Sequence, residues 1–152
     1  MKICADEHIS PKILRAVKEI VLSRSFSLFG VADLEFRGTE DEYWISTFAR
    51  NGGNAILSCD RKMLKRDSLL THIQETGLIA IYFPEEWAMA KRHFQAAHTL
   101  FWWPKIEETI NTAPSGSIWI MPPDFGNRSL KQYIKKIPKS ERAKERIKSH
   151  SV

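Results

Sequence analysis

Three aspartates, Asp6, Asp41 and Asp60, are the residues of this sequence whose type and position best suit chemistry. Asp6 and Asp60 each follow a short apolar run that is typical of a buried strand. In a parallel α/β sheet, ligands bind at the carboxyl ends of the strands, so both aspartates are expected at the edge where a site belongs. A carboxylate there must be solvated, paired or bound to a metal, because burying it alone is costly.

Carboxylates that converge on one point repel one another, and a divalent cation would relieve that repulsion. Hard oxygen ligands favour Mg²⁺ or Mn²⁺ over zinc. Such an ion polarises a phosphoryl group, orients an attacking water and lowers its pKa, so the aspartates predict hydrolysis of a phosphodiester. The alternative for Asp6 and Asp60 is pairing with the nearby Arg61, Lys62 or Lys65.

Asp41 opens the helix that precedes the third predicted strand. It reaches the same edge of the sheet only if segment 29–40 carries it there, and the sequence alone does not establish that path. The alternative is a local role, because an aspartate in the first helical turn is favoured by capping and by the helix dipole. The path of segment 29–40 decides between the two roles.

A run of positive charge directly follows Asp60. It consists of Arg61, Lys62, Lys65 and Arg66. Charge at this position would lie beside the predicted metal, where a scissile phosphate is expected, and the run therefore predicts contacts with RNA. The alternative is a surface turn whose charges are solvated or form weak ion pairs with nearby carboxylates.

Strands alternate with helices along most of the chain. The predicted strands are residues 2–5, 25–29, 54–59, 78–83 and 117–121. The first predicted helix follows Ser10-Pro11, and the next two span 41–51 and 68–76. A fourth begins at Pro84, and a fifth runs from Pro104 to Ile110. Pro122-Pro123 is expected to close the folded unit. This alternation predicts an α/β fold, a three-layer α/β/α sandwich with a mainly parallel central sheet.

An aromatic cluster marks the C-terminal half of the fold. Trp102 and Trp103 are adjacent, and adjacent side chains at a helix junction do not easily both face the interior. One of the two is therefore expected in an exposed patch that could bind bases or a protein partner. Trp87 and Phe94 lie upstream, and core packing is the expected role for most of these aromatic residues.

Composition predicts one globular domain of an ordinary size. The chain has 152 residues, of which 43% are apolar. It shows no secretory signal pattern and no apolar run near the roughly 20 residues of a spanning helix, so we expect a soluble, cytoplasmic protein with no membrane association. Cys4 and Cys59 form no disulfide framework and no zinc motif, and we expect buried thiols in a reducing compartment.

The net charge of +5 is unevenly distributed. Residues 1–125 carry 14 Lys+Arg and 16 Asp+Glu, whereas residues 126–152 carry 9 and 2. We therefore expect a folded domain at 1–125 and a basic C-terminal tail at 126–152. The tail could neutralise RNA phosphates, or it could be a solvated end without a specific partner.

Three segments together resemble the PIN-like domain superfamily. They read M-K-I-C-A-D-E-H-I-S-P, E-D-E-Y-W-I and A-I-L-S-C-D-R-K-M-L. The similarity is greatest to the compact group that includes the VapC-like toxin ribonucleases. It covers about the first 85 residues in order and spacing, and the ordered set is more specific than any one segment.

The resemblance implies a metal-dependent endoribonuclease that acts as the toxin of a toxin–antitoxin pair. It places Asp6, Asp41 and Asp60 at a Mg²⁺ or Mn²⁺ site that cuts RNA, with a protein antitoxin as partner. Dimerisation is common in the family, although no motif here indicates a homodimer. The sequence departs from the pattern at His8, where Asn is usual, and at Met63, where a second acid is frequent. The candidates for a fourth acid are Glu7, Glu40, Glu42 and Asp67.

Two alternatives belong to other functional classes. The missing fourth acid and the basic tail would also suit a catalytically inactive PIN-like module that binds RNA or protein. A phosphoacceptor receiver domain would likewise place Asp6-Glu7 and Asp60 after its first and third strands. It also needs Ser or Thr at the end of the fourth strand, where this chain has Tyr82-Phe83.

Overall fold

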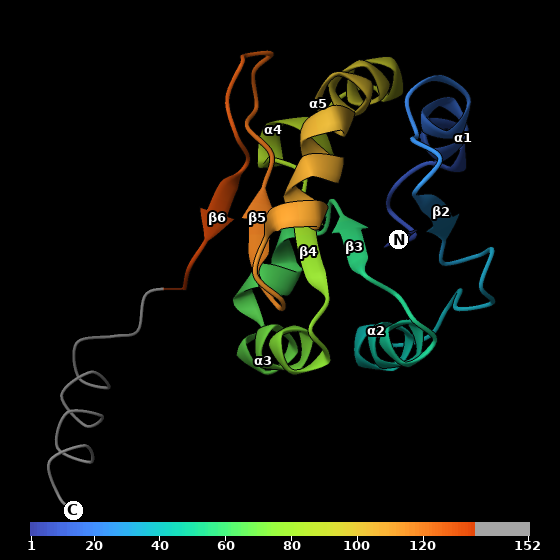
Figure 1. The fold of residues 1–152 in the computed structure, drawn as a ribbon, viewed down its shortest axis with the longest axis vertical. Helices are drawn as coiled ribbons and strands as arrows, with labels where there is room; N and C mark the ends of the chain where they lie inside the picture. The colour runs from blue at the N-terminus through green and yellow to red at the C-terminus, as the bar shows by residue number, and fades with distance from the viewer. Residues whose placement is uncertain (136–152) are drawn as a thin grey trace, which may run out of the picture.

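A single six-stranded sheet forms the centre of the protein (Figure 1). The computed structural model describes residues 1–135. The strands are β1 (Lys2–Ala5), β2 (Ser27–Gly30), β3 (Ala55–Ser58), β4 (Ile79–Tyr82), β5 (Ile118–Ile120) and β6 (Lys131–Tyr133). Their spatial order is β2-β1-β3-β4-β5-β6, and every neighbouring pair is parallel except the antiparallel β5 and β6. The predicted mainly parallel α/β fold is confirmed.

Helices cover both faces of the sheet (Figure 1). They are α1 (Pro11–Ile20), α2 (Asp41–Arg50), the 3₁₀ turn η1 (Arg61–Lys65), α3 (Asp67–Thr76), α4 (Glu85–Ala88) and α5 (Arg92–Thr112). One core cluster joins α1 and α5 to the sheet, and a second joins α2 and α3 to its other face. In β1, Ile3 and Ala5 enter the first cluster while Cys4 enters the second, because successive strand side chains alternate between faces.

The helix boundary predicted at Pro104 is wrong. Helix α5 continues through Pro104, and the break lies earlier, between α4 and α5. Proline removes one helical hydrogen bond. Trp103 and Ile106 on either side of it are fully buried, and their packing holds the helix continuous.

Both adjacent tryptophans are buried, contrary to the prediction that one would be exposed. Trp102 Nε1 donates to the carbonyl of Asp124 at 2.8 Å, and Trp103 Nε1 donates to the carboxylate of Glu107 at 2.9 Å. Because each indole N–H has an acceptor, neither burial leaves an unpaired donor. The half-exposed aromatic side chains nearby are instead Phe94, Phe101 and Phe125.

The prediction that residues 117–121 form the last strand, closed by Pro122-Pro123, is also wrong. Strand β6 pairs with β5 through Ile118↔Tyr133 and Ile120↔Lys131. Leu130, just before β6, is buried in the core cluster with α1 and α5. The sheet thus extends into the segment expected as a basic tail, of which residues 136–152 lie outside the described part of the chain.

Within residues 1–135, no helix has both the length and the apolar character needed to span a lipid bilayer.

Candidate active site

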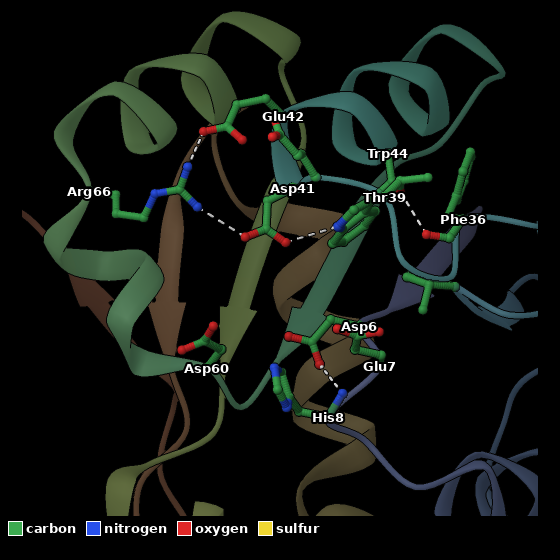
Figure 2. A pocket seen from close by; sticks show the side chains of 12 residues that line it. Asp6, Glu7, His8, Phe36, Thr39, Asp41, Glu42, Trp44, Asp60 and Arg66 are labelled. Atoms are coloured by element: carbon green, nitrogen blue, oxygen red, sulfur yellow. Dashed lines mark hydrogen bonds and ion pairs between the residues drawn. The ribbon is translucent and has the colours of Figure 1, made fainter.

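A pocket of about 490 Å³ opens at the carboxyl ends of β1 and β3 (Figure 2). All three predicted aspartates line it. Its acidic side chains are Asp6, Glu7, Glu40, Asp41, Glu42 and Asp60. The other side chains with polar groups are those of His8, Thr39, Trp44 and Arg66. This edge of a parallel sheet is where the sequence predicted a site.

The strand order brings Asp6 and Asp60 together. Strands β1 and β3 are neighbours, with Ala5 opposite Leu57 in the register. The Asp6 amide continues the ladder by donating to the Leu57 carbonyl at 2.9 Å. Each aspartate therefore emerges beside the other, although 54 positions separate them in the sequence.

Asp6 is a buried carboxylate with two internal hydrogen-bond donors. Its Oδ1 accepts from the His8 amide at 3.0 Å, and its Oδ2 accepts from the Ser58 hydroxyl. Only 5% of the residue is exposed. Burial raises the pKa of Asp6 from 3.8 to about 6, with the Asp60 charge adding to the rise and the hydrogen bonds from Ser58 and His8 opposing it.

Ser58 connects the two aspartates, and sequence reasoning missed it. Its hydroxyl donates to Asp6 and accepts from the Asp60 amide at 3.0 Å. The available signal was a buried hydroxyl at the last position of an otherwise apolar strand, two residues before Asp60. Asp60 itself caps η1, because its Oδ1 accepts from the Lys62 amide at 3.0 Å.

The loop between β2 and α2 carries Asp41 to the pocket. It turns back beside β1, where the Val31 amide donates to the Ala5 carbonyl at 3.1 Å. Phe36 is buried against the α2 side of the sheet, and its amide donates to the Val31 carbonyl at 2.8 Å. Glu35 (φ 62°) and Gly38 (φ 77°) adopt the left-handed conformation that this compact path requires.

Asp41 does not cap its helix. Glu40 is the N-cap residue, and the Asp41 carboxylate accepts from Trp44 Nε1 at 3.1 Å through Oδ1 and from Arg66 Nη1 at 3.1 Å through Oδ2. Arg66 also pairs with Glu42. Figure 2 shows Asp41 across the pocket from Asp6 and Asp60, with Arg66 at one side.

The field of the three aspartates reaches Tyr82, a buried residue of β4. Burial raises the pKa of its hydroxyl, and the charges of Asp6, Asp41 and Asp60 raise it further. The pKa of the Cys59 thiol rises to about 12, chiefly through burial and then through the charges of Asp6 and Asp60. Both groups stay neutral near pH 7, so the negative charge of the site resides on the carboxylates.

The predicted basic run is divided by the fold. Arg66 turns into the pocket, whereas Arg61, Lys62 and Lys65 belong to η1 and do not line it. Among the ion pairs of residues 1–135, none joins these three to Asp6 or Asp60. The basic residue that pairs in the pocket is Arg66, and its partners are Asp41 and Glu42.

The donor chemistry of the pocket fits a hard divalent cation. Six carboxylates line it, and burial and the charge of Asp60 disfavour ionisation of Asp6, which a cation would offset. With the side-chain positions observed in residues 1–135, no three His, Cys, Asp or Glu residues lie close enough together to hold a metal ion. Asp41 is turned to Trp44 and Arg66, so its carboxylate would have to reorient to serve as a ligand.

The four candidates for a fourth acidic residue differ in whether they line the pocket. Glu7, Glu40 and Glu42 line the pocket, whereas Asp67 pairs with Lys135 outside it. Met63 is 1% exposed, and its sulfur lies 3.5 Å from the Ser58 hydroxyl oxygen, so this position belongs to the core. The extra negative charge in the pocket thus comes from glutamates near Asp6 and Asp41.

A mainly parallel α/β sheet with an acidic pocket at its carboxyl edge defines the class of this protein. A family model described as a PIN-like domain matches residues 1–85, more than half of the chain. The chain belongs to the PIN-like domain family, which has a nuclease-type fold. The match includes all three pocket aspartates and ends after β4. Comparisons with curated proteins and with solved structures gave no match.

The residues at the ends of β4 and β5 are not those that the receiver alternative needs. Strand β4 ends at Tyr82 and is followed by the buried Phe83, where a receiver needs Ser or Thr. Strand β5 ends at Ile120 and leads into Met121-Pro122, where a receiver needs Lys before Pro.

Proposed function

We propose that this protein is a Mg²⁺- or Mn²⁺-dependent endoribonuclease and the toxin of a toxin–antitoxin pair. The observation that carries the proposal is the meeting of Asp6, Asp41 and Asp60, from three separate elements, in one acidic pocket of a PIN-like chain. Arg66 offsets only part of the charge of six carboxylates, so the pocket repels a polyanion, and a bound divalent metal would relieve that repulsion.

The proposed roles follow from the contacts of each residue. Asp6 and Asp60 hold the ion from the ends of β1 and β3, positioned by Ser58 between them. Asp41 completes the ligand set from α2. When bound, the ion supplies a Lewis acid that lowers the pKa of a bound water and polarises the scissile phosphate.

The basic residues of η1 supply the proposed RNA contacts. Lys62 and Lys65 are exposed and Arg61 is partly exposed, all directly after Asp60. Charges there attract the phosphates on either side of the cleaved bond, and each such contact steepens the salt dependence of binding. The partner that we propose is a protein antitoxin, which would block access of RNA to these basic residues.

Cleavage of a cellular RNA pool by the purified full chain, with Mn²⁺ or Mg²⁺, tests the activity. The variant carries Asp6→Asn and Asp60→Asn together, and we expect it to be slower by roughly 10²-fold or more. Its matched control carries Glu19→Gln and Glu75→Gln, the same charge change at exposed positions of α1 and α3, and should cut as wild type does. Expression in growing cells should arrest growth for wild type and control only.

Two outcomes would contradict parts of this proposal. If wild type leaves all RNA intact with every metal while still binding it, the protein is a non-enzymatic RNA-binding module on the same fold. If wild type cuts RNA but its expression leaves growth unchanged, the nuclease stands and the toxin role fails.

A further inference from the structure

Arg66 is the one lysine or arginine that lines the acidic pocket within residues 1–135. Six carboxylates surround the same space. Its guanidinium therefore stands in a space where the surrounding carboxylates attract positive charge. This position differs from that of Arg61, Lys62 and Lys65, which lie outside the pocket lining.

The contacts of Arg66 occupy the carboxylate of Asp41. Arg66 Nη1 lies 3.1 Å from Asp41 Oδ2, and Nη2 pairs with Glu42. Asp41 Oδ1 already accepts from Trp44 Nε1 at 3.1 Å. Both oxygens of Asp41 are thus engaged, and Asp41 cannot turn Oδ2 toward Asp6 and Asp60 while Arg66 holds it.

The backbone of Arg66 is fixed by hydrogen bonds, whereas its side chain is held in the pocket by ion pairs with Asp41 and Glu42. Its amide donates to the Met63 carbonyl at 3.1 Å, and its carbonyl accepts from the Leu69 and Leu70 amides at 3.0 Å. All three of these partners are buried. The side chain is 44% exposed, and ion pairs at such exposure contribute little to stability.

We infer that Arg66 occupies the cation position of the metal-free pocket and leaves Asp41 when a divalent ion binds. This inference rests on the proposed function and adds a competition step to it. In the metal-free state, the guanidinium neutralises Asp41 and Glu42. When an ion enters, Asp41 turns toward Asp6 and Asp60, and the released Arg66 stays at the pocket rim, where its charge attracts a substrate phosphate.

Mn²⁺ titration of the full chain by calorimetry, without RNA, tests the competition. We expect Arg66→Gln to bind Mn²⁺ roughly threefold to tenfold tighter than wild type, because a competitor for Asp41 is gone. Arg66→Met, which keeps the aliphatic stem, should behave alike. Arg61→Gln is the matched control, since it removes the same charge five residues earlier in the sequence but from a side chain with no ion pair to Asp41, and it should gain much less.

An Asp41→Asn background separates displacement from long-range repulsion. If Arg66 acts through Asp41, the gain of Arg66→Gln should disappear in that background. Equal affinities for Arg66→Gln and Arg61→Gln would overturn the inference, as would a gain that persists with Asp41→Asn. Those results leave the nuclease proposal intact if wild type binds Mn²⁺ and cuts RNA. If no variant binds Mn²⁺ and RNA stays whole, the proposed function fails and the inference fails with it.

Discussion

Asp6 is a buried acid whose ionised form destabilises the metal-free fold. Its pKa of about 6 lies above its ordinary value of 3.8, chiefly because burial removes water from the carboxylate. As pH rises from about 4 to 6, the unfolded chain has already released this proton while the folded chain still holds it. The free energy of unfolding therefore falls across that window and stays lower at higher pH.

Replacement of Asp6 by Asn should stabilise the metal-free protein at pH 7 and have less effect at pH 4. The shift from 3.8 to about 6 corresponds to a gain of up to about 3 kcal/mol at pH 7. The amide can keep both partners, because its oxygen accepts from His8 and its NH₂ donates to Ser58. Urea unfolding with a chelator present, at both pH values, measures the effect.

The control for this prediction is Glu75→Gln, which removes an exposed carboxylate of α3. It should change the free energy of unfolding by less than about 0.5 kcal/mol. A destabilised Asp6→Asn protein at pH 7 would show that the carboxylate stabilises the pocket through its hydrogen bonds more than burial of its charge destabilises it.

At the scale of the elements, the tight turn between α2 and β3 sets the start of the strand that ends near Asp60. Gly53 donates from its amide to the Phe48 carbonyl at 2.9 Å. A Cβ on Gly53 would lie 2.5 Å from the Phe48 ring and 2.7 Å from that same carbonyl oxygen. The backbone oxygen cannot move without disturbing the end of α2, so only glycine fits here.

Gly53→Ala should therefore destabilise the protein by roughly 1–3 kcal/mol, as overpacking against backbone does. Gly126→Ala is the comparison, because its Cβ would meet nothing nearer than the Asp124 carboxylate at 3.4 Å. That change should stay within about 0.5 kcal/mol. Thermal unfolding of both variants measures the difference, and equal melting temperatures would show that the α2–β3 turn yields readily.

At the scale of the whole molecule, β6 completes the sheet. It pairs along β5, and Leu130 beside it is 4% exposed in the core cluster that holds α1 and α5. A chain ending at residue 125 would uncover the edge of β5 and remove this side chain. Exposed edges also invite pairing with other chains.

We expect a chain ending at residue 125 to be less stable than one ending at 135 by roughly 2–5 kcal/mol, the cost of losing a buried leucine together with strand pairing. Denaturant unfolding of both chains measures the loss. Equal midpoints would show that β6 adds nothing to stability and that the folded unit ends at 125.

Much of the fold follows from local pattern. Ile13, Leu14 and Val17 recur at helical spacing, and all three are buried in α1. The apolar run 55–57 predicts β3, and Gly77 ends α3 in the left-handed conformation. The helix boundary predicted at Pro104 was wrong because packing of its neighbours outweighs one missing hydrogen bond. The predicted exposure of Trp102 or Trp103 was wrong because their indole N–H groups find acceptors at Asp124 and Glu107.

The sequence by itself determined that Asp6 and Asp60 closely follow parallel strands, because hydrophobic periodicity and strand ends are local properties of the chain. Only the tertiary structure decided that β1 lies beside β3, that segment 31–40 brings Asp41 to the same pocket, and that Arg66 holds it. These facts depend on contacts between residues 25 to 52 positions apart. Such contacts are selected by packing of the whole chain, which no local pattern encodes.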